Sequence, residues 1–243
     1  MTERRLYAPE LPAEGGEVAL GSDVAKHARL VLRLGVGDAV VLFDGAGFEA
    51  RGTVAAADRD TLRCTVRPRE LAAAEALEIH LIQGMPKGGK IDDIVRMCTE
   101  LGVAAIHLAD TERSVPDLGE RAAKRVERLE KIAREAARQC GRARVPVIHA
   151  PAPLLEIARR AAADDIKVLF WEETRGDAAV QKARAGEQVR VWVVIGPEGG
   201  ISAAEAEALV REGFVLSGLG PTVLRVETAA PVGVALVRDR LVR

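Results

Sequence analysis

The sequence predicts an α/β protein in two parts: a small β-rich unit over residues 1–70 and a larger α/β domain over residues 74–243. Two observations predict this division. In the first part, short apolar runs are separated by turn residues, whereas in the second part strand-like runs alternate with longer helical stretches. Alternation of this kind is typical of an α/β domain with a mostly parallel sheet.

The first part is predicted to be a small β-barrel with one helix. Apolar runs with the character of strands lie at 17–20, at 39–43 and across 51–66. Turn residues separate these runs, as Asp44-Gly45 does after the second run. A helix is expected over Asp23–Leu32, with Ser22 or Asp23 as its N-cap. Residues 69–76 are interpreted as a connector to the second part.

The second part is predicted to alternate strands with helices. Strand-like runs lie at 77–83, 104–108, 167–171 and 189–195. Helical stretches are expected at 90–101, 117–140, 154–163, 202–212 and 228–241. Ser202 and Glu205 have the spacing of a capping box, and the stretch 117–120 resembles another. Gly141 is expected just after the end of the long helix, as its C′ residue.

Composition excludes several classes of protein. Lys plus Arg number 35 and Asp plus Glu number 36, so the net charge of -1 argues against a globally basic nucleic-acid coat. Two Trp, one Tyr and four Phe are too few for a protein that stacks many bases on aromatic side chains. The polar amino terminus lacks a signal-peptide core, and no uncharged run approaches the roughly 18 residues of a membrane span. We therefore expect a cytoplasmic protein without membrane contact.

No metal centre is expected. The four histidines, which lack the spacing of metal ligands, are His27, His80, His107 and His149. The three cysteines form no C-x-x-C pair, and Cys98 and Cys140 are expected as buried thiols on apolar helix stripes. The G-x-S-x-G pattern of α/β-hydrolases does not occur in the sequence.

The segment Gly196-Pro197-Glu198-Gly199-Gly200 follows a buried-looking strand and precedes a helix. Loops at the carboxyl ends of parallel strands are where α/β folds bind ligands. Glycines let a ligand approach backbone N–H groups, and the amino terminus of a helix favours negative charge. A ligand-binding loop and a tight structural turn both fit this pattern. Because the spacing is not G-x-G-x-x-G, a nicotinamide-binding interpretation has no fingerprint.

A second glycine-rich segment, residues 84–90, has the G-x-x-x-x-G-K pattern between a strand and a helix. A phosphate-binding P-loop needs Ser or Thr next, to hold magnesium, and Ile91 takes that place. A nucleoside triphosphatase is therefore disfavoured. Direct contact with a polyanion is a better use of Lys87 and Lys90.

The long helix and its surroundings carry a local excess of positive charge. Between Glu112 and Arg144, ten basic residues stand against six acidic ones, which gives +4. Pairs spaced i, i+4, such as Glu127 with Lys131, are expected on a solvated face. The residues beyond these pairs, which are candidates for phosphate contacts, are Arg138, Gln139, Arg142 and Arg144.

The segment 218–229 contains a glycine-proline turn, a short apolar run and then Arg225 and Glu227 at the start of the last helix. These two residues fit a functional site and a structural ion pair equally well.

Taken in order, these segments resemble the RsmE family, the 16S rRNA uridine-N3 methyltransferases of the SPOUT superfamily. The matching pieces are Arg4-Arg5-Leu6-Tyr7, residues 27–33 with Gly37-Asp38, Phe43-Asp44-Gly45, residues 87–90, 99–103, 111–114, 135–140, 195–200 and 224–229. Each piece alone is a weak signal, whereas their joint order and spacing is highly specific. The chain departs from the family at Pro231, where the family is usually alanine-rich, and at Cys140, which often corresponds to Ser.

The resemblance implies a PUA-like barrel, a SPOUT-type parallel sheet with a deep trefoil knot at its carboxyl end, and a homodimer. It also implies that S-adenosylmethionine binds among the knot loops, with a further contribution after the strand that ends at Phe170-Trp171. The residues assigned to the cofactor are Gly196, Pro197, Glu198, Gly199, Gly200, Leu219, Gly220, Val223, Leu224 and Arg225.

The implied reaction moves a methyl group to N3 of a uracil in 16S rRNA of the small ribosomal subunit, uridine 1498 in standard rRNA numbering. Arg225 and Arg113 are candidates for stabilising the charge that develops on the ring carbonyls. Glu198 or Glu227 accepts the N3 proton or orients an arginine. The residues expected to hold RNA are Arg4, Arg5, Arg29, Arg33, Lys87, Lys90, Arg113, Arg138, Gln139 and Arg142. The alternative is an RNA-binding or ribosome-assembly module without catalysis.

Overall fold

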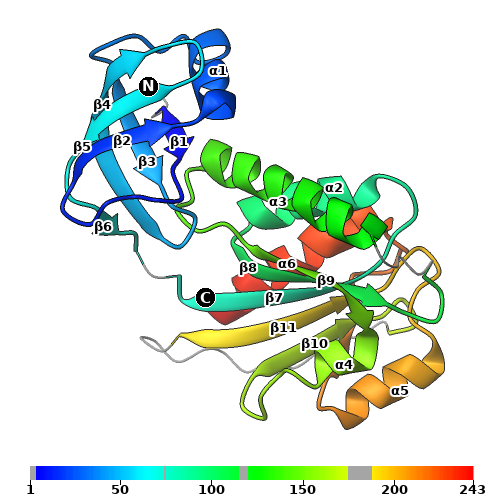
Figure 1. The fold of residues 1–243 in the computed structure, drawn as a ribbon. Helices are drawn as coiled ribbons and strands as arrows, with labels where there is room; N and C mark the ends of the chain where they lie inside the picture. The colour runs from blue at the N-terminus through cyan, green and yellow to red at the C-terminus, as the bar shows by residue number, and fades with distance from the viewer. Residues whose placement is uncertain (1–3, 74, 115–119, 175–187, 243) are drawn as a thin grey trace. The chain divides into compact units, whose positions relative to one another are not determined.

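The structure is a computed structural model that describes residues 4–73, 75–114, 120–174 and 188–242 of the chain. It divides into two compact units (Figure 1). The first unit comprises Met1–Ala74 together with Arg134–Val145, and the second comprises Glu75–Ala133 together with Pro146–Arg243. The predicted helical stretch begins at 117, but residues 117–119, and with them the resemblance to a capping box, lie outside the described residues.

The first unit contains a six-stranded sheet in the order β1-β3-β4-β5-β2, with β6 paired to β4. Only the β1–β3 pair is parallel among these. The elements are β1 (Arg5–Tyr7), β2 (Gly16–Leu20), α1 (Ser22–Leu30), β3 (Ala39–Phe43), β4 (Phe48–Ala57), β5 (Leu62–Val66) and β6 (Glu70–Leu71). Strand β6 lies inside the segment predicted as a connector, so that prediction was wrong at 70–71.

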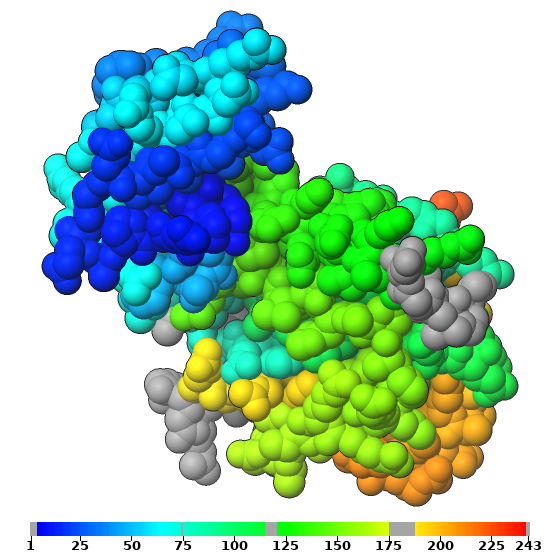
Figure 2. Space-filling model, in the orientation of Figure 1, coloured from blue at the N-terminus to red at the C-terminus, as the bar shows by residue number. Residues whose placement is uncertain are grey.

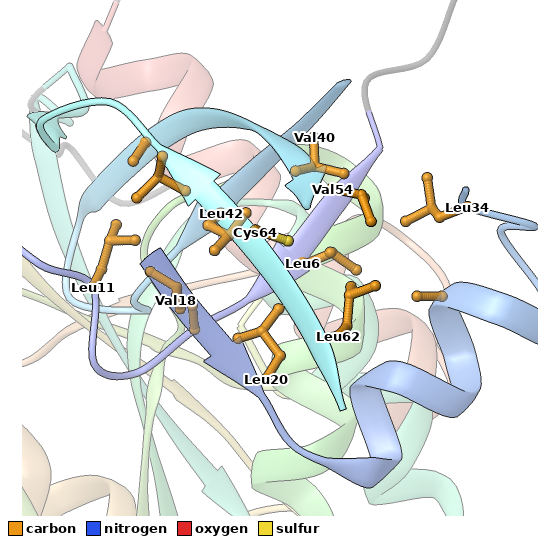
Figure 3. Packing of buried hydrophobic residues seen from close by; sticks show 14 of the residues in the cluster. Leu6, Leu11, Val18, Leu20, Leu34, Val40, Leu42, Val54, Leu62 and Cys64 are labelled. Carbon is orange, nitrogen blue, oxygen red and sulfur yellow. The ribbon is translucent and has the colours of Figure 1, made fainter. Parts of the chain in front are cut away.

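The core of this unit follows from the alternation of its strands. In β5, Leu62, Cys64 and Val66 are buried while the residues between them are exposed. Figure 3 shows Leu62 and Cys64 packed among the side chains of the neighbouring strands, including Leu42 and Val54. Period-two burial is what a sheet with one covered face requires.

Two local predictions for the first unit have different outcomes. The Asp44 turn is confirmed, because Asp44 Oδ1 accepts hydrogen bonds from the backbone N–H groups of residues 46, 47 and 48 at 2.8–3.0 Å. The predicted cap of α1 is wrong, because the N-cap is Gly21 and no side chain caps the helix.

The second unit contains a six-stranded, all-parallel sheet in the order β12-β10-β11-β7-β8-β9. Its strands are β7 (Leu77–Gly84), β8 (Val103–Asp110), β9 (Val147–Pro153), β10 (Ile166–Phe170), β11 (Val189–Ile195) and β12 (Val215–Ser217). Its helices are α2 (Lys90–Glu100), α4 (Leu154–Ala158), α5 (Ala203–Arg211) and α6 (Val226–Val242), and α3 (Glu120–Cys140) spans both units. The α/β prediction with a mostly parallel sheet is confirmed.

The two edge strands, β9 and β12, were not predicted from the sequence. Strand β9 carries Pro151 and Pro153, which an edge strand tolerates because one side of its backbone is unpaired. Strand β12 has three residues, too few for a clear alternation. Helix α4 ends at Ala158, earlier than expected, and α6 begins at Val226, two residues earlier than expected, with Pro231 inside it.

Helices cover both faces of the parallel sheet. On one face, Leu154 and Ile157 of α4 and Leu209 of α5 pack with Leu169 and Trp192 of the sheet. Figure 2 shows α4 and α5 next to each other on the surface of this unit. Helices α2 and α6 contact each other and the strands β7, β8 and β11. Because all six strands run parallel, their carboxyl ends lie at one edge of the sheet, where the loops that follow them meet.

Several helix predictions can be checked residue by residue. The capping box of α5 is confirmed, with Ser202 and Glu205 bonded to each other's backbone N–H. Gly141 has φ +86° after α3, as a C′ glycine requires. Burial raises the pKa of the Cys98 thiol to about 12, as expected for a buried cysteine. Cys140 is exposed, so its prediction as a buried thiol was wrong. Among the described residues, no helix is long and apolar enough to cross a membrane.

Candidate functional site

A cavity of about 440 Å³ lies at the carboxyl ends of β10 and β11 in the second unit. Three segments form it: residues 170–174 after β10, residues 195–200 after β11, and residues 219–226 before α6. Cavities of this size at this edge of a parallel sheet are the usual ligand sites of α/β folds. All ten residues predicted to bind the cofactor line the cavity, and we name residues 196–200 the glycine loop and residues 218–225 the Arg225 loop.

The glycine loop follows its path because neighbouring backbone lies very close to it. A Cβ on Gly84, at the end of β7, would lie 2.6 Å from Pro197 Cδ and 2.7 Å from Pro197 N. Gly200 has φ +72°, which favours glycine, and its N–H donates to the Pro197 carbonyl at 2.9 Å. The loop is therefore a tight structural turn that also forms a wall of the cavity.

Gln83 holds the start of the glycine loop, and sequence analysis missed it. This residue is fully buried, and its Nε2 donates to the carbonyls of Gly84 at 2.9 Å and Gly196 at 3.3 Å. An amide directly after the apolar pair Leu81-Ile82, at the end of a strand, was the available signal, because buried polar groups are retained where they are hydrogen-bonded.

Glu198 is held by the start of α2. Its two carboxylate oxygens each accept the Lys87 backbone N–H at 3.1 Å, and Oε1 accepts from Lys90 Nζ at 2.8 Å. Burial alone would raise the pKa of Glu198, but the Lys90 ammonium and the Lys87 N–H outweigh it and hold that pKa below its ordinary value. A carboxylate with this environment is a poor proton acceptor. Lys90 also lines the cavity, and its bond to Glu198 further disfavours a P-loop role.

Arg113 contacts the glycine loop from the segment after β8. Its Nη1 donates to the Gly199 carbonyl at 2.7 Å. Among the described residues, those that line the cavity do not include Arg113. The arginine therefore contacts the glycine loop without lining the cavity.

Arg225 lies on the rim of the cavity and its side chain is 86% exposed. Its Nη1 is 4.0 Å from Glu227 Oε1, which is at the outer limit of an ion pair. Glu227 is mostly buried, and its Oε2 has no hydrogen-bond partner among the described residues. Val223 beside it is 82% exposed, so the Arg225 loop presents side chains outward.

Aromatic and polar residues after β10 complete the cavity. They are Phe170, Trp171, Glu172 and Thr174. From the sequence, a contribution was predicted only as following the strand that ends at Phe170-Trp171. Trp171 Nε1 donates to the Ile201 carbonyl at 3.0 Å, which fixes the indole against the end of the glycine loop. The expected third contribution to the site therefore lies next to the predicted loops.

The arginines and lysines predicted to hold RNA have different surroundings. Arg29, Arg33, Lys87 and Gln139 are exposed. Arg4 pairs with Asp38 at 2.8 Å and remains partly exposed. Arg138 pairs with Glu135, whose side chain lies one turn away on α3, and Arg142 is half-buried.

Arg5 is the exception among these residues. Its side chain is 8% exposed, pairs with Glu49 at 2.9 Å and lies over the Phe43 ring. A guanidinium in this position stabilises the sheet of the first unit and is much less accessible than the exposed arginines. Arg144, a further phosphate candidate, donates to the Ala46 carbonyl at 2.9 Å.

Comparison with known proteins agrees with this geometry. The family described as "RNA methyltransferase domain" matches residues 73–238, and the one described as "RNA methyltransferase PUA domain" matches residues 20–67. The ribosomal RNA small subunit methyltransferase E of Mycobacterium bovis is 34% identical, over 98% of this chain and 92% of its own length. That of Bacillus subtilis is 33% identical, over 91% of this chain and 87% of its own length.

Two solved structures cover nearly the whole chain. The methyltransferase E of Neisseria gonorrhoeae, bound to S-adenosyl methionine, has a TM-score of 0.89 at 26% identity, covering 99% of this chain and 98% of its own. A putative methyltransferase of Legionella pneumophila, in complex with the same cofactor, has a TM-score of 0.87 at 28% identity and 98% coverage of both chains. The chain therefore belongs to the RNA methyltransferase family that joins a PUA domain to an RNA methyltransferase domain, with ribosomal RNA small subunit methyltransferases E among its members.

Proposed function

We propose that this protein methylates N3 of a uracil in the 16S rRNA of the small ribosomal subunit, with S-adenosylmethionine as the methyl donor. One observation carries the proposal. The loops that follow β10, β11 and β12 enclose one cavity, and every residue assigned to the cofactor lines it. The full-length likeness to relatives that bind this cofactor supports it.

The residues of the cavity fit S-adenosylmethionine chemically. Leu219, Val223 and Leu224 offer apolar surface to an adenine, and the glycine loop exposes backbone groups beside them. Gly200 lets the Glu172 carboxylate approach the glycine loop closely, since a Cβ there would lie 1.6 Å from Glu172 Oε1. The cofactor supplies a methyl group on a positively charged sulfur, and carboxylates such as Glu172 favour a positive charge nearby.

In the proposed reaction, the chain's own residues orient the base and stabilise charge. Loss of the N3 proton leaves negative charge on the uracil carbonyls, and the exposed guanidinium of Arg225 stabilises it. Glu227 orients Arg225, because its carboxylate is mostly buried and 4.0 Å from the guanidinium. The N3 proton goes to solvent water, which reaches the open rim. Orientation of base and methyl in one cavity supplies much of the rate, since proximity is worth roughly 7–11 kcal/mol.

RNA binding is proposed for the first unit and for the exposed cations of the second. In this proposal, residues 1–70 form the PUA-like RNA-binding part and residues 74–243 form the methyltransferase part. Arg29, Arg33 and Lys87 are exposed, as phosphate contacts require. We expect affinity for 16S rRNA to fall steeply between about 50 and 200 mM salt, measured by filter binding. Salt-independent binding would count against these contacts.

The proposal includes the trefoil knot and the homodimer of the family. After β12, at the edge of the sheet, the chain returns past the carboxyl ends of β10 and β11 and enters α6, which packs on β7 and β11. This path supports a knot. The homodimer rests on family membership and predicts about twice the 25.9 kDa of one chain in sedimentation experiments. The proposed substrate locates the protein in the cytoplasm, with the ribosomal subunits.

The test is methylation of small subunits from a strain that lacks this protein. Purified protein and labelled S-adenosylmethionine should place one methyl group on a uracil of 16S rRNA, located by mass mapping. Cofactor binding without methyl transfer to any uracil would overturn the substrate. RNA binding without cofactor binding would favour the non-catalytic assembly module.

A further inference from the structure

The segment after β8 is anchored to the loop that follows β11, although about 85 residues of sequence separate them. Residues 111–114 form a closed turn, in which the Ser114 N–H donates to the Thr111 carbonyl at 3.1 Å and the Thr111 N–H donates to Ser114 Oγ at 2.9 Å. The Glu112 N–H donates to Glu205 Oε1 at 2.8 Å. The turn therefore has a fixed position at the start of α5.

This position aims one side chain at the glycine loop. Arg113 Nη1 donates to the Gly199 carbonyl at 2.7 Å, a short bond from a charged donor. The aliphatic part of the same side chain packs on Gly199, because a Cβ there would lie 3.0 Å from Arg113 Cβ. Both the head and the stem of Arg113 therefore contact the loop.

Glu205 links this contact to the amino terminus of α5. Its second oxygen, Oε2, accepts the Ser202 N–H at 3.0 Å and completes the capping box. One carboxylate thus holds the helix that follows the glycine loop and the turn that carries Arg113. Groups held in this way lose little conformational entropy when a ligand binds.

We propose that Arg113 is a positioning residue of the methyl-transfer reaction, which holds the Gly199 carbonyl and thereby keeps the glycine loop in the conformation that receives the cofactor. This inference rests on the proposed function and deepens it. It replaces the expectation that Arg113 stabilises charge on the uracil, because the guanidinium is bonded to the Gly199 carbonyl and does not line the cavity. Arg225 then carries the charge stabilisation alone.

The two roles predict different measurements. If Arg113 holds the loop, Arg113→Met weakens binding of S-adenosylmethionine in the absence of RNA by about tenfold or more, since a hydrogen bond to a charged group contributes about 1.5–3 kcal/mol. Turnover at saturating cofactor then changes little. If Arg113 acts on the uracil, cofactor affinity is unchanged and kcat falls by about 10²–10³.

Binding is measured by calorimetry and by the fluorescence of Trp171, which lines the cavity. Arg113→Lys should recover part of the affinity, because an ammonium still donates to a carbonyl but lacks the planar fork. Arg121→Met removes an exposed arginine from α3 and should bind the cofactor like the parent protein. Thermal unfolding of each variant checks that the fold is intact.

Gly199→Ala tests the same contact from the loop side, because the added methyl group displaces the stem of Arg113. The double variant Gly199→Ala with Arg113→Met should bind the cofactor no more weakly than the single variant with the lower affinity. This non-additivity is expected because the two residues share one contact. Equal cofactor affinity in the parent protein and a folded Arg113→Met variant would overturn this inference alone. Absence of cofactor binding by the parent protein would overturn the proposed function, and the inference with it.

Discussion

The glycine loop and the Arg225 loop line the same cavity but are held in opposite ways. Three members of the glycine loop are fixed from outside the loop: Gln83 holds Gly196, the start of α2 holds Glu198, and Arg113 holds Gly199. In the Arg225 loop, Val223 is 82% exposed and Arg225 is 86% exposed.

A glycine packed against the glycine loop and a glycine of the Arg225 loop show the same contrast. A Cβ on Gly84 would overlap the backbone of the glycine loop, whereas a Cβ on Gly220 in the Arg225 loop would meet nothing within 4 Å. One wall of the cavity is therefore preorganised before any ligand arrives, and the other is free to adapt. We infer that the held wall receives the cofactor in a fixed shape, and that the exposed wall, besides its apolar contacts to the adenine, meets the RNA and acts in the chemical step.

The largest expected effect comes from the exposed wall. Arg225→Ala should lower kcat by about 10²–10³, the typical cost of losing a donor that stabilises developing charge. Cofactor affinity should fall by much less than kcat, because the contacts that hold the glycine loop do not involve this side chain. Single-turnover methylation and calorimetry on the same preparation measure the two quantities. Parent-level methylation by a folded Arg225→Ala variant would show that the exposed wall has no part in the chemistry.

A second prediction compares one glycine from each wall. Gly84→Ala should lower the free energy of unfolding by about 1–3 kcal/mol and weaken cofactor binding, because its methyl group overlaps Pro197 backbone that has no room to move. Gly220→Ala is the matched control: its φ of +113° makes alanine strained, but no atom lies in the way. Chemical denaturation and cofactor titration should both rank Gly84→Ala as the more damaging change. The reverse ranking would mean that the two walls are not held differently.

The sequence predicted the loops better than it predicted what holds them. The residues proposed to bind the cofactor were assigned through a family resemblance that rests on short local motifs, and such motifs can be read directly from the sequence. Gln83 and Glu205 act through partners about 90–110 positions away, and such partners become visible only when the sheet order is known. The edge strand β9 was missed because its prolines and half-exposed residues lack the apolar alternation of a central strand. The burial of Arg5 could not be predicted, because a buried ion pair and a phosphate contact use the same residue type.

The smallest expected effect is a pH dependence, which distinguishes the stability of the parallel sheet from the position of the glycine loop that it carries. His107 of β8 is buried beside His80 and His149, and burial, followed by these neighbours and Arg160, lowers the pKa of His107 to about 3. The unfolded chain takes up this proton near pH 6.5, so stability is fully present above that pH and declines as the pH falls toward 3. Each pH unit below 6.5 should remove about 1.4 kcal/mol.

Over the same pH range the glycine loop should stay in place. The pKa of Glu198 is already below its ordinary value of 4.5, so its bonds to Lys90 and Lys87 persist between pH 7 and 5.5. Urea unfolding should therefore show a loss of stability in that interval, while calorimetry shows nearly constant affinity for S-adenosylmethionine. His107→Asn should flatten the stability curve and leave the affinity curve as it is. If affinity instead falls in parallel with stability, the loop depends on the sheet's histidines, and the three side-chain contacts do not suffice to hold it.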